Sequence, residues 1–238
     1  MGTLVTYRLH DAVATITLDD GKVNVLSLAM LTELGAALDR AEADRALVVL
    51  TGREGVFSAG FDLAVLRAGG TEAADLLRAG FDLAARLLAF PAPVLVACTG
   101  HAVAMGVFLA LSGDYRIGAR GPYKITANEV AIGMTMPRAA VEICRQRLTP
   151  ACFNRAVVLA EVFPPEDAVA AGFLDRVVPA GELAEAAAAA AAELARLDLD
   201  AHAATKQRAR RLTGTALREA IDADDAAYRA WLAAQPAS

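Results

Sequence analysis

Cysteine is scarce in this sequence, and its metal-binding side chains form no recognisable motif. The 238 residues include only Cys98, Cys144 and Cys152, and an odd number of cysteines without metal-type spacing favours free thiols. The N-terminus also lacks the basic region followed by an apolar one that marks a secretory signal. We therefore expect a protein of the reducing cytoplasm that has no disulfide framework and no metal site.

Positive charge is not in excess either. The chain has 23 lysines and arginines against 28 aspartates and glutamates, a net charge of -5, so it lacks the basic footprint of a nucleic-acid-binding protein. The exception is a cluster formed by Lys206, Arg208, Arg210 and Arg211. We interpret this cluster as a solvated helix face, although it could also help to hold a phosphorylated ligand.

One stretch without charged residues, between Arg86 and Asp114, is long enough on length alone to span a bilayer. Pro91, Gly100 and Gly106 interrupt it, and such residues punctuate structure rather than continue a single helix. The stretch therefore predicts a strand, a turn and a buried helix inside a globular protein, and we expect no membrane association.

Short apolar strands alternate with helices up to about residue 137, and the remainder is helical. This alternation is typical of an α/β fold with buried parallel strands, and Ser27 is a good N-cap for the first helix. The alanine-rich segment 182–197 favours a further helix, because alanine has the highest helix propensity. The predicted elements before residue 137 are a hairpin of strands at 5–8 and 13–18, a helix at 27–44, a strand at 46–50, a helix at 72–90, and strands at 93–98 and 115–117.

The common nucleotide-binding and hydrolase motifs are not matched. No G-x-G-x-x-G follows a strand, and no Walker-type lysine loop occurs. Ser58 lies in a segment flanked by glycines, 55–60, but the spacing departs from the G-x-S-x-G of a nucleophile elbow. Ser58 as a nucleophile, with His101 or His202 as its base, is therefore the weaker hypothesis.

Three segments in order carry a resemblance to a known family. They are Gly-Lys-Val-Asn-Val-Leu at 21–26, Val-Phe-Ser-Ala-Gly-Phe-Asp-Leu at 56–63, and a segment at 100–117 that starts Gly-His-Ala and ends Asp-Tyr-Arg-Ile. In order and spacing they resemble the crotonase superfamily, which is the enoyl-CoA hydratase/isomerase family. The segment 168–175 resembles a fourth motif of that family, so the resemblance covers nearly the whole chain.

This resemblance implies a crotonase-like spiral of ββα units with a helical C-terminal region. We accordingly expect an α/β core at 1–180 and a helical trimerisation region at 181–238, with homotrimers that often pair into hexamers. The implied substrate is an enoyl thioester of coenzyme A, and no metal or redox cofactor is needed. By the resemblance, the residues that bind this substrate are Lys22, Val23, Val25, Ala59, Gly60, Asp62, Leu63, Gly106 and Phe108.

The chemistry implied by the resemblance starts with removal of a proton beside the thioester carbonyl, which produces an enolate oxyanion. Two backbone N–H groups aimed at that oxygen stabilise the charge as it develops. By the resemblance, these donors are the N–H groups of Phe61 and Met105. The family's glycine triplet is Ala104-Met105-Gly106 here, so we expect backbone donation to be retained in a narrower pocket.

The number of carboxylates distinguishes the reactions within this family. Related hydratases use two glutamates; one of these positions is Phe108 here, whereas the other is Glu129, in the segment 128–133. A single carboxylate suits an isomerase, since one base can remove a proton from C2 and return it to C4. We therefore expect Glu129 to be the catalytic residue of a Δ3-Δ2-enoyl-CoA isomerase, with a pKa raised by an apolar pocket.

Two alternatives stay open from the sequence. The chain could be an enoyl-CoA hydratase whose second carboxylate comes from elsewhere, with Glu142 and Asp82 as candidates. It could also be a catalytically weak acyl-CoA-binding protein, because Phe108 and the altered triplet depart from the family pattern. Acyl-chain length depends on the far end of the pocket, which we expect residues 66–90 to form.

Overall fold

The first two strands form because apolar side chains alternate along them. In β2 (Val13–Leu18), Ile16 and Leu18 are fully buried, and β2 pairs antiparallel with β1 (Val5–His10). Asp11 has a φ of +52° in the turn between them, a conformation that aspartate tolerates better than most residues. The predicted N-terminal hairpin is thus confirmed.

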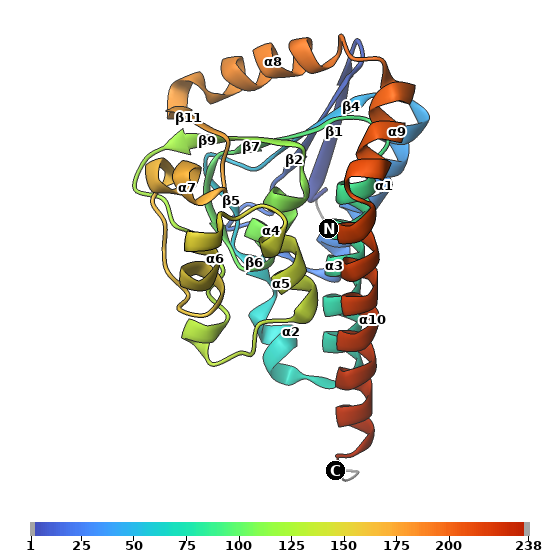
Figure 1. Cartoon of the computed structure of the whole chain (residues 1–238), viewed down its shortest axis with the longest axis vertical. Coiled ribbons are helices and arrows are strands. Elements are labelled where there is room, and N and C mark those ends of the chain that lie inside the picture. Colours follow the sequence, from blue (N-terminus) through green and yellow to red (C-terminus); the bar gives the residue numbers. More distant parts are fainter. Residues whose placement is uncertain (1–2, 236–238) are drawn as a thin grey trace.

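The main sheet of the computed structural model, which describes residues 3–235, has six strands. Besides β1 and β2 these are β4 (Leu47–Thr51), β7 (Val94–Cys98), β9 (Tyr115–Arg120) and β11 (Arg176–Pro179). Their order is β1-β2-β4-β7-β9-β11, and every pair after the first is parallel (Figure 1). Every residue of β7 is buried, as expected in the middle of a parallel sheet.

β11 contradicts one sequence prediction, which places only helices after residue 137. Four residues are too few to reveal an alternating pattern within a helical region, and β11 is held by its parallel pairing with β9. Asp175, the residue before β11, accepts hydrogen bonds from both the backbone N–H and the side chain of Arg116 in β9. The strand is therefore specified by tertiary contacts rather than by its own sequence.

A two-strand and helix unit repeats along the chain. After each of β2, β4, β7 and β9, the chain forms one or two short strands outside the main sheet and then a helix. These short strands pair with one another in parallel, as β10-β8-β5 and as β3-β6. The predicted spiral of ββα units is confirmed. The short strands are β3 (Val25–Leu26), β5 (Gly55–Ser58), β6 (Gly60–Phe61), β8 (Gly100–Val103) and β10 (Ile125–Thr126).

Helices cover both faces of the main sheet. On one face, α8 packs its small alanines onto β4, β7 and β9, whereas the other helices enclose the larger core on the opposite face (Figure 1). The predicted α/β core begins at residue 1 and the predicted C-terminal region ends at residue 238. Their outermost residues, 1–2 and 236–238, lie outside the described residues. The helices are α1 (Leu28–Ala43), α2 (Leu63–Ala68), α3 (Gly70–Ala89), α4 (Met105–Ser112), α5 (Arg138–Arg145), α6 (Pro150–Val157), α7 (Pro165–Ala171), α8 (Leu183–Leu194), α9 (Leu199–Ala209) and α10 (Arg211–Ala233), with 3-10 turns at Val130–Ile132 and Ala180–Glu182.

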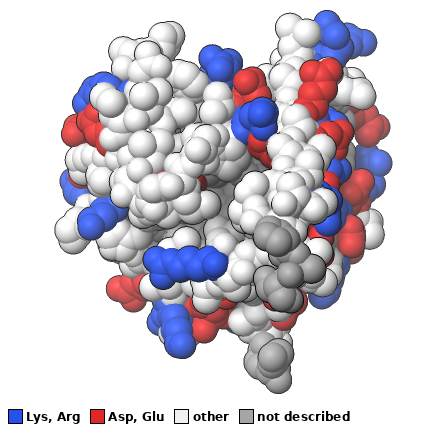
Figure 2. Space-filling view, turned by 90° about the horizontal axis from the view of Figure 1, so that it is seen from below, with Lys and Arg blue, Asp and Glu red and all other residues white. Residues whose placement is uncertain are grey.

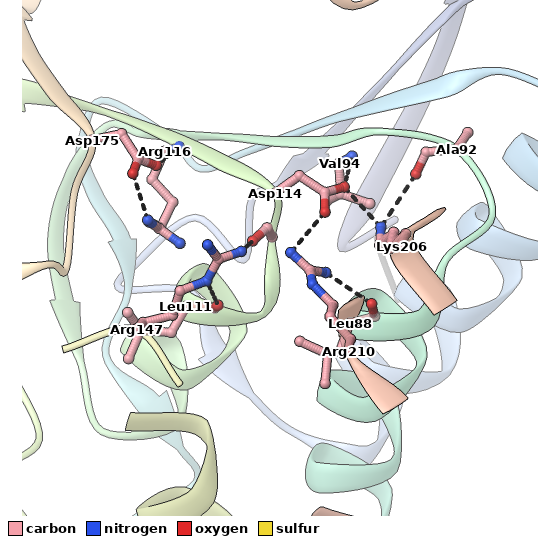
Figure 3. Close-up of polar contacts among 11 residues, drawn as sticks. Leu88, Ala92, Val94, Leu111, Asp114, Arg116, Arg147, Asp175, Lys206 and Arg210 are labelled. Atoms are coloured by element: carbon pink, nitrogen blue, oxygen red, sulfur yellow. Dashed lines mark hydrogen bonds and ion pairs between the residues drawn. The ribbon is translucent and has the colours of Figure 1, made fainter. Parts of the chain in front are cut away.

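A half-buried carboxylate fastens the C-terminal helices to the core. Asp114, just before β9, accepts from Lys206 Nζ at 2.7 Å and pairs with Arg210 at 2.8 Å (Figure 3). Arg210 also donates to the carbonyl oxygen of Leu88, at the end of α3. Burial lowers the pKa of Lys206 to about 8, although the nearby carboxylate of Asp114 opposes that shift.

The basic cluster is therefore not a solvated helix face throughout. Lys206 is only 7% exposed, whereas Arg208 and Arg211 do face solvent as expected. The prediction is wrong for Lys206 and Arg210 because their acidic partner, Asp114, lies far away in the sequence.

Candidate active site

The turn between β2 and β3 contains the first predicted substrate-binding segment. The carboxylate of Asp20 accepts from the backbone N–H groups of Lys22, Asn24 and Val25, at 2.7, 2.9 and 2.9 Å. Burial alone would raise the pKa of Asp20, but these three donors hold it below its ordinary value. The turn is thus fixed from within, while the side chain of Lys22 stays exposed.

Asn24 joins this turn to the second predicted segment. It is fully buried with a φ of +54°, and its side-chain amide donates to the carbonyl oxygens of Leu18 and Phe57. The Ala59 N–H donates to the carbonyl oxygen of Val23 at 3.0 Å. The structure therefore brings the predicted substrate-binding residues of 22–25 and 59–63 side by side.

The hydroxyl of Ser58 organises the segment that carries the first predicted oxyanion donor. Ser58 is fully buried; its Oγ donates to the Asn24 carbonyl oxygen at 2.7 Å and accepts from the Gly60 N–H at 3.1 Å. Gly60 precedes Phe61, so this bond fixes the backbone next to the predicted donor. The sequence suggests Ser58 only as a nucleophile, and no local pattern signals its positioning role.

Gly60 and Met105 bring the two predicted donors together. Gly60 has a φ of +90°, and a Cβ built on it would lie 2.9 Å from the carbonyl oxygen of Val103 and 3.2 Å from the backbone nitrogen of Met105. Only glycine allows this approach. Met105 is the first residue of α4, so its N–H has no partner within the helix and lies at the positive end of the helix dipole.

Two residues of the altered glycine triplet, Ala104 and Met105, fit at the start of α4 in different ways. Ala104 takes a left-handed φ of +50° just before α4, where a glycine would cost less strain. The Met105 side chain is fully buried, with its Cγ 3.6 Å from where a Cβ on Gly80 of α3 would lie. Gly106 stays essential, because a Cβ there would lie 2.5 Å from the carbonyl oxygen of Ser58.

Three aromatic rings pack against one another around Phe61, which carries the first predicted donor. The ring of Phe81, from α3, meets that of Phe61 edge-on at 6.0 Å and stacks on that of Phe108 at 6.2 Å between centroids. Phe108 is 1% exposed, so the position where related hydratases carry a glutamate is part of the core.

Asp62 caps α2, because its side chain accepts hydrogen bonds from the Ala64 and Val65 N–H groups.

Glu129 is buried without a partner for part of its carboxylate. Glu129 is only 6% exposed, and its Oε2 atom has no hydrogen-bond partner among the described residues. Burial raises the pKa of Glu129 to about 7, although a hydrogen bond from its own backbone N–H opposes the shift. Its charge in turn adds to the effect of burial in raising the pKa of the Cys144 thiol. These are the properties of a carboxyl group that can exchange a proton near neutral pH.

The two proposed sources of a second carboxylate are engaged elsewhere. Asp82 pairs with Arg78 at 2.9 Å and also with Arg218, and Glu142 pairs with Arg145 at 3.4 Å. Both carboxylates are thus neutralised by neighbouring arginines, which makes neither an evident partner for a catalytic water.

The serine-hydrolase alternative finds no support in the geometry. The Ser58 hydroxyl is already bonded on both sides within its own loop. His101 Nδ1 accepts from the Lys124 N–H at 2.9 Å, and His202 lies near Asp114 and Lys206 at the base of the C-terminal helices.

Between residues 3 and 235, no three or more His, Cys, Asp and Glu side chains gather as they would around a metal ion. Over the same residues, no helix combines the length and the apolar character that crossing a membrane requires.

Two large cavities lie near the sheet and its helices. One, of about 1010 Å³, is lined by β2, β4, β7 and α8 on the outer face of the sheet. The other, of about 690 Å³, lies between α3, α10 and residues 134–138. Figure 2 views the molecule from the end at which α10 terminates, where a hollow opens among mostly uncharged residues. None of the predicted site residues lines either cavity directly.

Comparison with known proteins matches nearly the whole chain to one family. The profile of the family described as enoyl-CoA hydratase/isomerase matches residues 8–235. The mitochondrial enoyl-CoA delta isomerase 1 of Homo sapiens is 34% identical over 218 residues, which are 89% of this chain and 72% of that protein.

Solved structures give the same match in three dimensions. One protein from Mycobacterium tuberculosis, described in one structure as an enoyl-CoA isomerase and in another as a probable enoyl-CoA hydratase, is 49% identical, with TM-scores of 0.91 (95% of this chain and 99% of that one) and 0.92 (94% and 96%). An enoyl-CoA hydratase from Mycobacterium ulcerans is also 49% identical with a TM-score of 0.91, over 94% and 98%. Relatives at equal identity thus carry both reaction names, so the reaction has to be argued from the residues.

Proposed function

The chain belongs to the enoyl-CoA hydratase/isomerase family, and we propose that it converts 3-enoyl-CoA thioesters into 2-enoyl-CoA thioesters. It is an enzyme of the crotonase superfamily. What supports isomerisation most directly is the environment of Glu129, a single buried carboxyl group with an unpartnered oxygen and a pKa of about 7.

In the proposed reaction, Glu129 carries one proton from one carbon to another. Its carboxylate removes a proton from C2 of the 3-enoyl thioester, and the electron pair moves into the carbonyl to form a dienolate. The protonated carboxyl then returns the proton to C4, which leaves the double bond between C2 and C3. A group whose pKa lies near the operating pH serves both steps, because it is neither too weak a base nor too weak an acid.

The dienolate oxygen is assigned in this proposal to the N–H groups of Phe61 and Met105. The close approach of Gly60 to the Met105 nitrogen supports the pairing of these donors. The start of α4 adds a positive field at the same place. The loss of one such donor costs about 3–4 kcal/mol of transition-state stabilisation in other enzymes. The coenzyme A part would lie along Lys22, Val23 and the segment 59–63.

Phe108 supports isomerisation over hydration. Hydration needs a water held between two carboxylates, and Phe108 is a buried ring stacked on Phe81. A glutamate placed at this position would bury a second carboxyl group in the apolar core. We therefore expect Phe108→Glu to destabilise the protein by several kcal/mol rather than to create a hydratase.

The experiment that tests the proposal compares two activities of the unmodified enzyme under one set of conditions. The enzyme is incubated separately with a 3-enoyl-CoA and with a 2-enoyl-CoA of equal length, and the products are identified by chromatography. Isomerisation faster than hydration supports the proposal. Efficient hydration without isomerisation would favour the hydratase, and no turnover on either substrate would favour a binding protein.

We also propose that the protein assembles into trimers, or pairs of trimers, through its C-terminal region. Apolar side chains there stay exposed in the single chain, among them Leu212 at 71% and Trp231 at 55%. Burial of such side chains on a neighbouring copy would stabilise the assembly. Light scattering at micromolar concentration should give three or six times the mass of one chain, and a monomer mass would contradict the proposal.

A further inference from the structure

We propose that a small inorganic anion, chloride or phosphate, binds inside the protein between the side chains of Arg116 and Arg147. The site would lie where β9, the C-terminal end of α4 and the connection from α5 to α6 meet. It is separate from Glu129 and from the proposed oxyanion donors, and the proposed reaction uses neither arginine.

Arg116 is buried with part of its guanidinium group unpartnered. Its side chain is only 3% exposed, and its Nη2 donates to the carboxylate of Asp175 at 2.7 Å. The other two nitrogens, Nε and Nη1, are buried and have no hydrogen-bond partner among the described residues. Buried N–H groups normally have a partner, because an unpaired one costs its full desolvation penalty. Arg116 therefore presents donors that need an acceptor.

Arg147 reaches the same place from another part of the chain. Its Nε donates to the carbonyl oxygen of Leu111 at 3.3 Å, and its Nη2 donates to that of Gly113. Both acceptors belong to the C-terminal end of α4, and neither is a carboxylate. The rest of the guanidinium group points toward Arg116 (Figure 3).

The two guanidinium groups are close enough to affect one another. Burial lowers the pKa of Arg147 to about 10, and among the neighbouring charges the largest contribution comes from Arg116. Burial also lowers the pKa of Arg116, although its partner Asp175 opposes that shift. Two like charges thus face one another in a place where water screens them poorly.

Positive charge is in excess around this pair. The ion pairs and the mutual effects on pKa values connect four side-chain cations with only two carboxylates. The negative end of the α4 dipole offsets about half of one charge. An anion would neutralise what remains. The six groups are Lys206, Arg116, Arg147, Arg210, Asp114 and Asp175.

The excess charge favours an anion over a water molecule as the acceptor. Water can accept hydrogen bonds from Arg116, but it leaves the repulsion between the two guanidinium groups in place. An anion accepts from both groups and separates their charges. Hydrogen bonds between two ionised partners are about twice as strong as neutral ones, and the planar guanidinium group suits anion recognition.

Such an anion would stabilise the fold rather than take part in the reaction. Arg147 holds the C-terminal end of α4, whereas the proposed oxyanion donor Met105 begins this helix at the other end. An enzyme that responds to anions but does not turn over 3-enoyl-CoA would therefore count only against the proposed reaction.

Two arginines close together in the sequence offer a matched pair of variants. Arg147→Met removes one of the two guanidinium groups that face the proposed anion. Arg145→Met removes an equal charge from a side chain that is 58% exposed and pairs with Glu142. General screening by salt acts on both variants alike, so only loss of specific binding distinguishes them.

Thermal unfolding at neutral pH and constant ionic strength provides the measurement. Sodium chloride or sodium phosphate replaces sodium gluconate, whose anion is too large for a buried site. An anion at about ten times its dissociation constant shifts the folding equilibrium about tenfold, which raises the midpoint by about 3–6 °C in a chain of this size. We expect this rise for the unmodified protein and for Arg145→Met, and no rise for Arg147→Met. The anion that acts at the lower concentration is the one that the site prefers.

An equal midpoint of the unmodified protein in gluconate, chloride and phosphate would overturn the proposal. A rise that Arg147→Met retains in full would overturn it as well, because the anion would then bind elsewhere.

Diffraction from crystals of the unmodified protein gives a test that does not depend on whether a variant folds. Crystals are soaked in sodium bromide, whose anion replaces chloride and scatters anomalously, or in sodium phosphate. Bromide or phosphate within hydrogen-bond distance of both Arg116 and Arg147 supports the proposal, and a water molecule there under both conditions overturns it. An anion seen there without any effect on the midpoint would be an adventitious ion only, which also overturns the proposal.

Discussion

Replacement of Glu129 by glutamine should inactivate the enzyme and, at alkaline pH, make it more stable. In the folded protein burial raises the pKa of Glu129 to about 7, whereas an unfolded chain ionises a glutamate near pH 4.3. Between these values the folded state holds a proton that the unfolded state has lost. The free energy of unfolding therefore falls as the pH rises through this window.

The magnitude follows from the difference between the two pKa values. At about 1.4 kcal/mol for each pH unit between them, the ionised carboxylate destabilises the fold by roughly 4 kcal/mol once the pH is well above 7. The amide of Glu129→Gln never ionises. An unpartnered amide in the same place costs about 1–3 kcal/mol, but that cost is the same at every pH. The change in its effect between pH 5 and pH 8.5 isolates the charge, and it should be about 2–3 kcal/mol in favour of the variant.

The assay is urea unfolding of both proteins at pH 5 and at pH 8.5, together with turnover of a 3-enoyl-CoA. Glu142→Gln is the control, because it removes a carboxylate that is paired with Arg145 near the surface, and its effect should stay below about 1 kcal/mol at both pH values. Turnover by Glu129→Gln at the level of the unmodified enzyme would refute the role of the base. An equal stability effect at both pH values would show that the carboxylate of Glu129 is not desolvated in solution.

Two further substitutions test the Ser58 hydrogen bonds and the Asp114 ion pairs described above. Ser58→Ala removes the hydroxyl that fixes the backbone beside the first predicted oxyanion donor, so kcat should fall about tenfold to 100-fold while the dissociation constant of butanoyl-CoA changes little; an unchanged kcat in steady-state assays would contradict this. Asp114→Asn leaves the buried Lys206 and the half-buried Arg210 without their carboxylate, so the free energy of unfolding in urea should fall by about 3–5 kcal/mol. Asp200→Asn breaks an exposed ion pair instead and should cost less than about 1 kcal/mol.

Local features of the fold could be predicted from the sequence because nearby residues determine them. Ser27 accepts from the Met30 N–H at 3.2 Å and starts α1 as expected. Leu31, Leu34 and Leu38 are buried along one face of that helix, as their spacing predicts. The ββα spiral itself was reachable only through the family resemblance, since no local pattern specifies how the strands pair.

The features that sequence reasoning missed depend on partners far away in the chain. Lys206 can be buried because its ammonium group pairs with the carboxylate of Asp114, which lies 92 positions earlier in the chain. The strand β11 forms because it pairs in parallel with β9. No pattern among neighbouring residues in the sequence predicts either contact.

In the candidate site too, some residues are indicated by the sequence, whereas the contacts of others are visible only in the fold. Motif position alone singled out Glu129, Phe61 and Met105, and their proposed roles stay predictions to be tested. The hydrogen bonds of Ser58 and the place of Phe81 between the oxyanion segment and the cavity became visible only in three dimensions.

The packing of α10 against α3 has a consequence for synthesis of the chain on the ribosome. Arg229 of α10 pairs with Asp75 of α3 across 154 positions, and a ribosome that adds about 5–20 residues each second needs roughly 8–30 s to make that length. During that interval the apolar side of α3 lacks the helix that covers it. A nascent chain would therefore be most exposed to aggregation, and most dependent on chaperones, just before its last helix emerges.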